Sequence, residues 1–330
     1  MNNNKNGFPK ANLFDFERFC EDTMDEWYDA KHRKPSDSEL RLLDGLPIKC
    51  CPRCGCDRFK RSGRYRNGTR RYRCLGCGRA FSPLTGTPFD SHKIPISEWP
   101  EYLIHLFEFH SIASSARDNR NVKNTGKYWI SKVFAVLSGC QDNVILSGRV
   151  YLDETYFSVK PKDEERKDGK LLRGLSRNKI CVATATDGKH VLLAVCGSAK
   201  PSKTKLLKVF GGHIAKGSTI VHDGEKSHSA LIEDFKLKEE LHKGSKTKGL
   251  ENKDNPMEPI NAVHRVLKRF MRSHPSYDRG SLQDWLNLFW FIATNKDKTP
   301  QEKAMRFIQM AILTHKVVRY REIFPENVDE

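Results

Sequence analysis

The stretch YLDETYF, residues 151–157, places two carboxylates, Asp153 and Glu154, inside an alternation of aromatic and β-branched residues that is typical of a β-strand. Successive side chains of a strand point to opposite faces of the sheet, so only one of these acids can face a given site. A second apolar segment, STIVHDGEKSH (residues 218–228), ends at Asp223. Aspartates at neighbouring strand ends can bind divalent cations through their oxygens. Acids at strand ends are also often simply solvated, so this pattern alone is weak evidence for a metal site.

The same period of two predicts four strands, which are followed by helices after residue 257. The expected strands are 149–158, 179–187, 190–198 and 218–223. Strands followed by helices indicate a mixed α/β or α+β domain.

The segment NPMEPINAVHRVLKRFM predicts a helix that begins near Glu258, because Pro259 suits the first helical turn. At about 100° per residue, Asn261, His264 and Lys268 fall on one face of this helix. Asn261 offers an oxygen ligand, and Lys268 offers a cation that could counter the charge on a transferring phosphate. His264 taken alone is more simply explained as a surface or packing histidine.

Two knuckles, CPRCG and CLGCG, supply Cys51, Cys54, Cys74 and Cys77, with nineteen residues between the two pairs. This doubled C-x2-C spacing predicts a tetrahedral structural zinc site. A glycine follows the second cysteine of each knuckle and lets backbone N–H groups turn toward the sulfurs. Two further cysteines, Cys50 and Cys56, do not form a symmetric pair and are not expected to be ligands.

The positive charge of the chain is concentrated near these cysteines. The formal net charge is +17 and the sequence pI is about 9.4. Residues 49–79 contain eleven basic residues and one acid, whereas residues 1–46 contain ten acids and seven bases. A local basic segment suits contact with phosphates, although many zinc ribbons are purely structural. If this cysteine segment is a zinc ribbon that binds DNA, its candidate DNA-binding residues are Arg64, Arg66, Arg70, Arg71 and Arg73.

Helical periodicity predicts an amphipathic helix over residues 11–32, which packs either on its own chain or on a partner. Residues 112–137 predict a helix-turn-helix, with a second helix capped by Asn124 or Thr125 and with Lys127 and Lys132 exposed to DNA. Two helices joined by a turn are also common in domains that do not bind DNA.

The start of the chain lacks the apolar core of a signal peptide, and no segment reaches the ~18 apolar residues that a membrane-spanning helix needs. We therefore expect a soluble protein without membrane contact. Ten cysteines in a reducing compartment favour metal binding over disulfides. The expected organisation is multidomain: an acidic N-terminal helical segment (1–46), a zinc ribbon (47–90), a helical helix-turn-helix-like region (91–147) and a catalytic domain (148–330).

These stretches together resemble bacterial insertion-sequence transposases that carry an amino-terminal zinc ribbon and an RNase H-like catalytic domain of the DDE type. The similarity is to the branch in which Asn replaces the third acid and Lys follows. It covers roughly residues 50–293 and rests on the ribbon with its tail FSPLTGTPF, then SEWPEYL, YLDETYF, IVHDGEKSH, and INAVHRVLKRFM with the later RGSLQDWLNLFWF.

The resemblance implies that Asp153 and Asp223 bind the catalytic metal, that Asn261 is the third ligand and that Lys268 contacts phosphate. Glu154 would point away. A neutral amide binds a divalent cation less strongly than a carboxylate does, which leaves open whether Glu258 or His264 assists.

The implied function is a DNA transposase that binds terminal inverted repeats and catalyses metal-dependent strand cleavage and strand transfer. Its implied cofactors are a structural Zn²⁺ and a catalytic Mg²⁺ or Mn²⁺. Its implied partners are double-stranded DNA, as element ends and as target, and further copies of itself, as a homodimer or higher oligomer on DNA. The implied location is the bacterial cytoplasm, with the nucleoid. Two alternatives remain: a catalytically inert zinc-ribbon regulator, and a metal-dependent nuclease of the same fold.

Overall fold

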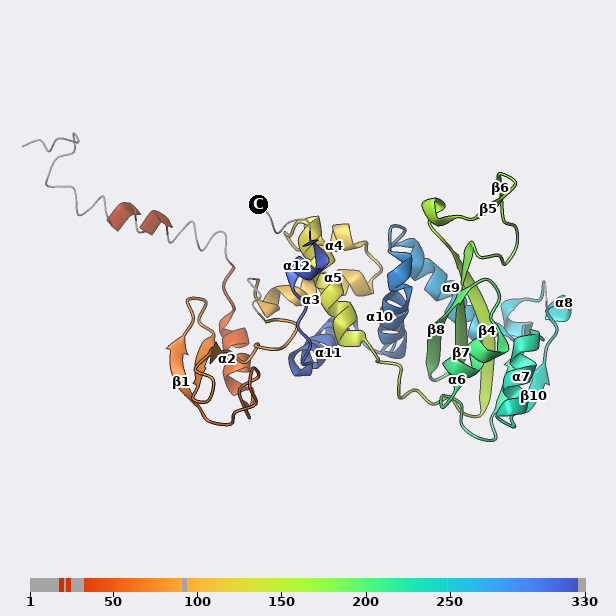
Figure 1. Cartoon of the computed structure of the whole chain (residues 1–330), viewed down its shortest axis with the longest axis horizontal. Helices are drawn as coiled ribbons and strands as arrows, with labels where there is room; N and C mark the ends of the chain where they lie inside the picture. The colour runs from red at the N-terminus through yellow and green to blue at the C-terminus, as the bar shows by residue number, and fades with distance from the viewer. Residues whose placement is uncertain (1–17, 21, 25–32, 91–93, 248, 326–330) are drawn as a thin grey trace, which may run out of the picture. The chain divides into compact units, whose positions relative to one another are not determined.

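The computed structural model of the chain contains two compact units (Figure 1). It describes residues 18–20, 22–24, 33–90, 94–247 and 249–325. One unit comprises Met1–Tyr102 and Ala304–Arg319, and the other comprises Leu103–Lys303 and Tyr320–Glu330. The helix expected over residues 11–32 lies largely outside the described residues, although 18–20 and 22–24 are helical. The division into four segments stays a prediction.

The first unit contains a small three-stranded antiparallel sheet. Its strands are β1 (Phe59–Arg64), β2 (Arg70–Cys74) and β3 (Ala80–Phe81). The rings of Phe59, Tyr72 and Phe81 meet at centroid distances of 5.4 to 5.7 Å and form its core. Tyr72 is therefore a core residue and is not exposed beside the neighbouring arginines of β2. So small an apolar core cannot fold about 30 residues without further support.

A buried acid organises the rest of the first unit. Helix α2 (Asp37–Gly45) begins where the Ser36 hydroxyl accepts a hydrogen bond from the N–H of Glu39. The Glu39 carboxylate then accepts the N–H groups of Ile96 and Ser97 at 3.0 and 2.9 Å. These N–H groups begin η2 (Ile96–Glu98), which leads into α3 (Trp99–Phe107), so Glu39 satisfies donors that a helix start leaves unpaired.

The second unit is built on a five-stranded mixed sheet. The strand order is β10-β9-β4-β7-β8, in which β4, β7 and β8 are antiparallel neighbours while β9 and β10 run parallel to β4. The strands are β4 (Arg149–Ser158), β7 (Lys179–Thr186), β8 (Val191–Ser198), β9 (Thr219–His222) and β10 (Lys238–Leu241). The mixed α/β class and four of the strands are thus confirmed, and β10 was not predicted.

Helices cover both faces of this sheet. On one face, α6 (Lys203–Phe210) and α7 (Lys226–Asp234) pack on a core that includes Val150 and Leu152. On the other face lies α9 (Glu258–Arg272), which begins at the predicted residue. Met257 and Ile260 at its start pack against Val221 and Tyr151, and this contact fixes the helix over β4 and β9.

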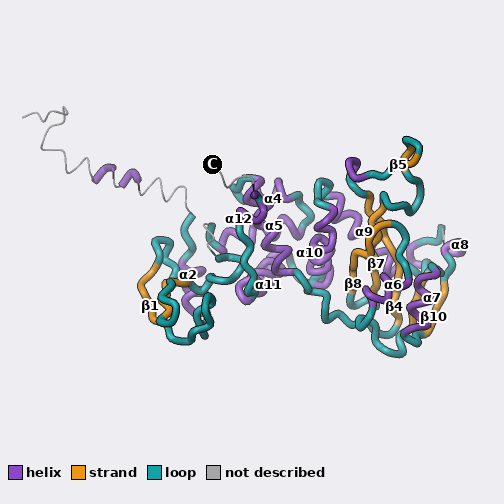
Figure 2. The backbone as a smooth tube through the Cα atoms, in the orientation of Figure 1, coloured by secondary structure: helices purple, strands orange, loops and turns teal. Residues whose placement is uncertain are grey.

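Side chains cover the edge of the sheet at β8, which is the last strand in the strand order. The side chains of Gln141, Gln283 and Trp290 hydrogen-bond the main chain of β8 at 2.8 to 3.1 Å. Gln283 and Trp290 come from α10 (Leu282–Thr294), which lies beside β8 (Figure 2). An edge strand covered in this way cannot pair with another chain.

The remaining elements are mostly short helices. They are α4 (Ile112–Asp118), α5 (Lys123–Leu137), η3 (Pro161–Asp163), the hairpin strands β5 (Arg166–Lys167) and β6 (Lys170–Leu171), α8 (Gly244–Thr247), η4 (Asn252–Asp254), η5 (Arg279–Ser281), α11 (Pro300–Leu313) and α12 (Tyr320–Ile323). The expected cap at Asn124 or Thr125 is wrong, because α5 begins earlier and Val122 is its N-cap. Among the described residues, every helix is too short or too polar to cross a bilayer.

Candidate active site and metal centres

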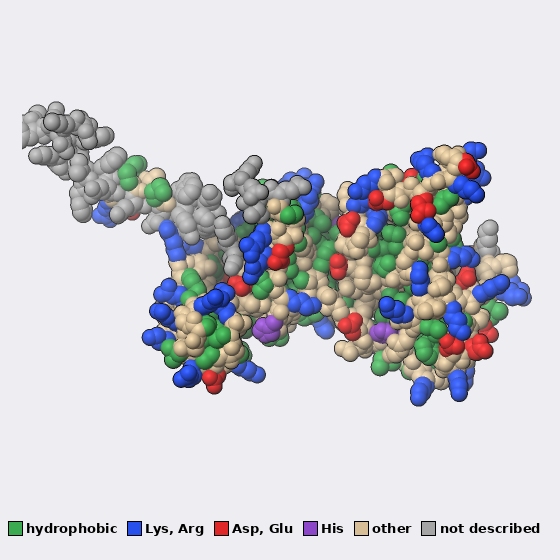
Figure 3. Space-filling view, in the orientation of Figure 1, with side chains coloured by type: hydrophobic (Ala, Val, Ile, Leu, Met, Phe, Trp, Pro, Cys, Tyr) green, Lys and Arg blue, Asp and Glu red, His purple; other side chains and the backbone are tan. Residues whose placement is uncertain are grey.

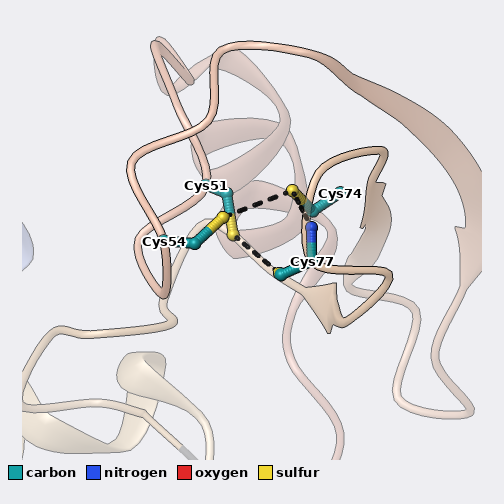
Figure 4. A group of neighbouring side chains, drawn as sticks. All are labelled: Cys51, Cys54, Cys74 and Cys77. Atoms are coloured by element: carbon teal, nitrogen blue, oxygen red, sulfur yellow. Dashed lines mark hydrogen bonds between the residues drawn. The ribbon is translucent and has the colours of Figure 1, made fainter.

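The four knuckle cysteines meet at one point in the first unit (Figure 4). Their sulfurs approach in pairs, Cys51 to Cys77 at 3.9 Å and Cys54 to Cys74 at 3.6 Å. Four sulfurs at about 2.3 Å from a tetrahedral zinc ion stand about 3.8 Å apart, so both of these separations are close to those of a zinc site.

Backbone geometry prepares these sulfurs as ligands. The N–H groups of Gly76 and Cys77 point at the Cys74 sulfur at 3.3 and 3.4 Å. The N–H of Cys77 is the main cause that lowers the pKa of the Cys74 thiol to about 6, which favours the thiolate that binds metal. Gly55 and Gly78 have φ of 73° and 71°, in the left-handed region that the knuckle turn requires.

Of the two candidate catalytic aspartates, Asp153 lies on β4, and Asp223 directly follows the neighbouring parallel strand β9. Tyr151 of β4 pairs with Val221 of β9 in the last pair of this ladder, and each aspartate follows its member of that pair by two residues. Burial raises the pKa of the Asp153 carboxyl to about 7, with smaller contributions from the charges of Glu154 and Asp223. The two aspartates are therefore near enough to repel each other, and a bound cation would relieve that repulsion.

Helix α9 presents polar residues to Asp153. The Nδ1 atom of His264 lies 3.6 Å from Oδ2 of Asp153. Burial, and then the charge of Lys268, lowers the pKa of His264 to about 4, so this imidazole is neutral at pH 7. Asn261 and Lys268 precede and follow His264 by three and four residues, and so lie on the same helix face. His264 thus lies beside Asp153, whose pKa also responds to the charge of Asp223, and Asn261 and Lys268 share the helix face of His264.

The two auxiliary candidates differ in where they point. The carboxylate of Glu258 binds the guanidinium of Arg265 at 2.5 and 3.1 Å, and this pairing lowers the pKa of Glu258. Its oxygens are thus engaged on the exposed side of α9. His264 is buried and lies beside Asp153, so the geometry favours His264 over Glu258 as the auxiliary group.

Two threonines that no sequence motif indicates add polar atoms near Asp153. Thr184 is the cross-strand partner of Asp153, and Thr155 lies on the same face of β4. Both side chains are buried, and neither hydroxyl has a hydrogen-bond partner among the described residues. The ring nitrogen Nε2 of His264 is likewise buried without such a partner. The face of the sheet that carries Asp153 is therefore unusually polar for a protein interior.

The second acid of the opening stretch, Glu154, faces the opposite side of the sheet. Its Oε1 lies 2.8 Å from Nε2 of His228 on α7, and both side chains are buried. The ring of His222 lies 5.3 Å from that of His228 and approaches Glu239 at 3.0 Å. Glu154 thus has a partner of its own and does not share the site of Asp153.

The candidate DNA-binding arginines of the ribbon lie on and around β1 and β2, where Lys and Arg side chains gather on the visible face (Figure 3). Arg64 and Arg70 both contact the carboxylate of Asp44, at 2.5 and 3.5 Å. Arg71 donates to the carbonyl of Ser62 at 2.7 Å, while Arg73 is exposed. Arg66 is also exposed.

The predicted exposure of Lys132 is wrong. Lys127 is exposed on α5 as expected, but the side chain of Lys132 is fully buried. Its Nζ lies 4.4 Å from the centre of the Tyr128 ring, where a cation is attracted by the aromatic face. Seven residues of α5 are buried, so its apolar face is wider than the sequence pattern indicates and Lys132 lies inside it.

Residues 145–288 match the model of the ISXO2-like transposase domain. The match spans β4 through α9 and most of α10, and so includes all four candidate catalytic residues. It supports a transposase, an enzyme that acts on DNA. No curated protein matches the chain.

Three solved structures, a viral intasome and two Mos1 complexes, are similar to this chain at low sequence identity. The simian T-cell lymphotropic virus intasome in complex with PP2A regulatory subunit B56 gamma is 11% identical with a TM-score of 0.28, and covers 45% of this chain and 49% of its own. The Mos1 strand transfer complex is 12% identical with a TM-score of 0.30, covering 63% and 74%. The mariner Mos1 paired end complex with Mg is 11% identical with a TM-score of 0.28, covering 64% and 76%. The chain thus spans about half of the first of these, and such TM-scores support no assignment.

Proposed function

We propose that this protein is the DNA transposase of an insertion sequence, with an RNase H-like catalytic domain of the DDE type. The observation that carries the proposal is the match of residues 145–288 to a transposase domain, because the matched segment contains Asp153 on β4 and Asp223 directly after the parallel strand β9. The mixed sheet with helices on both faces is consistent with an RNase H-like fold.

In this proposal Asp153, Asp223 and Asn261 hold Mg²⁺ or Mn²⁺ through oxygen atoms, the ligands that hard divalent cations prefer. When bound, the cation activates the attacking oxygen and stabilises the leaving oxygen of a phosphodiester. Lys268 offsets negative charge on the phosphate. His264 stays neutral beside Asp153 and keeps α9 close to the strand without adding positive charge that would compete with the cation.

The ribbon and the helices α4 and α5 contribute DNA binding at the element's inverted repeats. The four cysteines hold a structural Zn²⁺ that fixes β1 and β2, and the exposed arginines of these strands contact phosphates. Lys127 remains a candidate contact on α5. Lys132 does not, because its side chain is buried.

A strand-transfer assay tests the proposal. The full chain is incubated with Mg²⁺, a duplex that carries the DNA flanking its own gene, and a target plasmid, and joined products are measured. We expect Asp153→Asn and Asp223→Asn to lower joining by at least about 10³-fold, because each removes a charged metal ligand. Asp142→Asn, which neutralises an exposed carboxylate in the loop after α5, is the matched control and should retain full joining.

The products separate the proposal from its alternatives. Cutting without joining would identify a nuclease, and end binding without either reaction would identify a regulator. Mg²⁺ provides a second readout: it should raise the melting temperature of the wild type and not that of Asp153→Asn. Full joining by both aspartate variants would refute the assignment of the site.

A further inference from the structure

A second group of metal-ligating side chains lies in the second unit, where α3 meets α4. One nitrogen of His105, one nitrogen of His110 and one carboxylate oxygen of Asp118 lie within 4.8 Å of one another. The Nδ1 atom of His105 is 3.4 Å from Oδ2 of Asp118, and the two histidine rings stand edge to face at 5.0 Å. None of these residues belongs to the ribbon or to the candidate active site.

The backbone is folded so that His110 returns over His105. The N–H of His110 donates to the carbonyl of His105 at 3.0 Å, and the N–H of Phe109 donates to that of Leu106 at 3.2 Å. This pair of bonds is a Schellman motif, which ends α3 and needs a residue in the left-handed conformation. That residue is Phe109, with φ of 69°, in a position that usually takes glycine.

The Phe109 ring explains why a large residue is tolerated in this strained position. It packs edge to face on Phe270 at 5.2 Å, and the guanidinium of Arg269 lies over it at 5.3 Å. These contacts anchor the turn on α9 and so hold His110 in place beside His105. The two imidazoles are therefore positioned by the fold and are not merely neighbours on a mobile loop.

The spacing of the polar atoms suits a metal ion better than a simple ion pair. Ligands about 2.1 Å from a tetrahedral Zn²⁺ stand about 3.4 Å from one another, which matches the distance from His105 to Asp118. The Nδ1 atom of His105 is buried and has no hydrogen-bond partner among the described residues. The Asp118 carboxylate is oriented by the Ser114 hydroxyl, which donates to it at 3.1 Å, as carboxylate ligands commonly are.

We propose that His105, His110 and Asp118 bind a divalent transition-metal ion such as Zn²⁺, independently of the four-cysteine site. Two imidazoles and a carboxylate are ligands that Zn²⁺ accepts, with a fourth position for water. The ion links the end of α3 to α4 and so fixes the first helix of the α4–α5 pair. The proposal does not depend on the transposase function.

The metal content of the purified full chain tests this site. After dialysis against metal-free buffer we expect about two Zn²⁺ per chain, one from each cluster. His110→Ala and His105→Ala should each contain about one, because the remaining two ligands hold zinc weakly. His315→Ala replaces an exposed histidine outside the cluster and should keep about two. Equal zinc content in the wild type and both cluster variants would overturn the proposal.

Cobalt substitution gives an answer that does not depend on a variant that folds. Co²⁺ at the cysteine site shows sulfur-to-metal charge-transfer bands, whereas Co²⁺ bound by nitrogen and oxygen shows only weak visible bands. We expect a titration of the metal-free wild type to show two classes of bound Co²⁺, the second without charge transfer. Saturation after about one equivalent, with charge transfer throughout, would also overturn the proposal.

Discussion

Asp153 shows what the fold does to a single side chain. It stands on a strand between a buried apolar core and α9, and its carboxyl would gain a proton near pH 7 because burial disfavours the charged form. Although the net charge of the chain is +17, the titratable residue of α9 that lies beside Asp153 is His264, which burial keeps neutral. In the proposed active site, a divalent cation would neutralise the charge of this carboxylate.

A buried histidine at the end of α9 predicts how stability depends on pH. His274 is stacked on Trp285 at 4.3 Å, and neither of its ring nitrogens has a hydrogen-bond partner among the described residues. Burial lowers its pKa to about 4, whereas an unfolded histidine titrates near pH 6.5. The unfolded state thus binds the proton more tightly, and the free energy of unfolding falls as the pH falls from about 6.5 to about 4.

We expect His274→Phe to remove this component, so that over that range the wild type loses up to roughly 3 kcal/mol relative to the variant. Urea unfolding at a series of pH values measures the difference. His274→Gln separates titration from polarity, because glutamine keeps buried polar atoms at this position but has no titratable group. Its free energy of unfolding should be lower than that of His274→Phe by the same amount at every pH. Parallel stability curves for the wild type and the Phe variant would contradict the prediction.

At the scale of an element, β7 carries two buried threonines, of which one has hydrogen-bond partners for its hydroxyl and the other has none among the described residues. The Thr186 hydroxyl donates to the carbonyl of His190 at 2.7 Å and accepts the N–H of Gly188 at 3.1 Å. The hydroxyl of Thr184 has no partner among the described residues. A buried hydroxyl without a partner costs free energy, whereas one that is satisfied contributes.

We therefore expect Thr184→Val to leave the free energy of unfolding unchanged or to raise it by about 1 kcal/mol, and Thr186→Val to lower it by about 1–3 kcal/mol. Chemical unfolding of both variants in Mg²⁺-free buffer gives the comparison. A loss at Thr184 as large as that at Thr186 would mean that its hydroxyl has a polar partner in the folded protein, such as water held beside Asp153.

Elements with strong periodicity were predictable, and elements without it were not. The alternation in YLDETYF predicted β4, and the start of α9 followed from Pro259. β10 was missed because its sequence, KEEL, is largely exposed and polar, and only its pairing with β9 defines it. Lys132 was misplaced because a helix pattern does not show how wide the buried face becomes once neighbours pack on it. The spacing of the cysteines predicted their cluster.

Other groupings depend on contacts that no local pattern contains. Thr184 faces the site only through the register of β4 with β7. His105, His110 and Asp118 have no metal-binding spacing in the sequence, and they meet only because Phe109 adopts a positive φ. The aspartate pair required the parallel pairing of β4 with β9 as well as a resemblance to a known family.

At the scale of the whole molecule, the distribution of charge predicts how binding depends on salt. Eleven of the basic residues lie within residues 49–79, so a ribbon that contacts DNA releases counterions from phosphates there. Each phosphate contact contributes about 0.9 to the slope of log affinity against log salt concentration. A ribbon that is only structural would contribute nothing to this slope, whatever the net charge of the chain.

Arg73 offers a clean test, because it is exposed on β2 while Arg64 and Arg70 are tied to Asp44. We expect Arg73→Ala to weaken binding of the full chain to duplex DNA at low salt and to lower the salt slope by about 1, similarly for every DNA sequence. Lys216→Ala is the matched control, since this exposed lysine precedes β9, at the opposite end of the strand from Asp223, and its slope should equal that of the wild type. Fluorescence anisotropy at salt concentrations from roughly 50 to 300 mM measures the slopes of both variants and of the wild type. Equal slopes for Arg73→Ala and the wild type would mean that Arg73 makes no contact with phosphate in the complex.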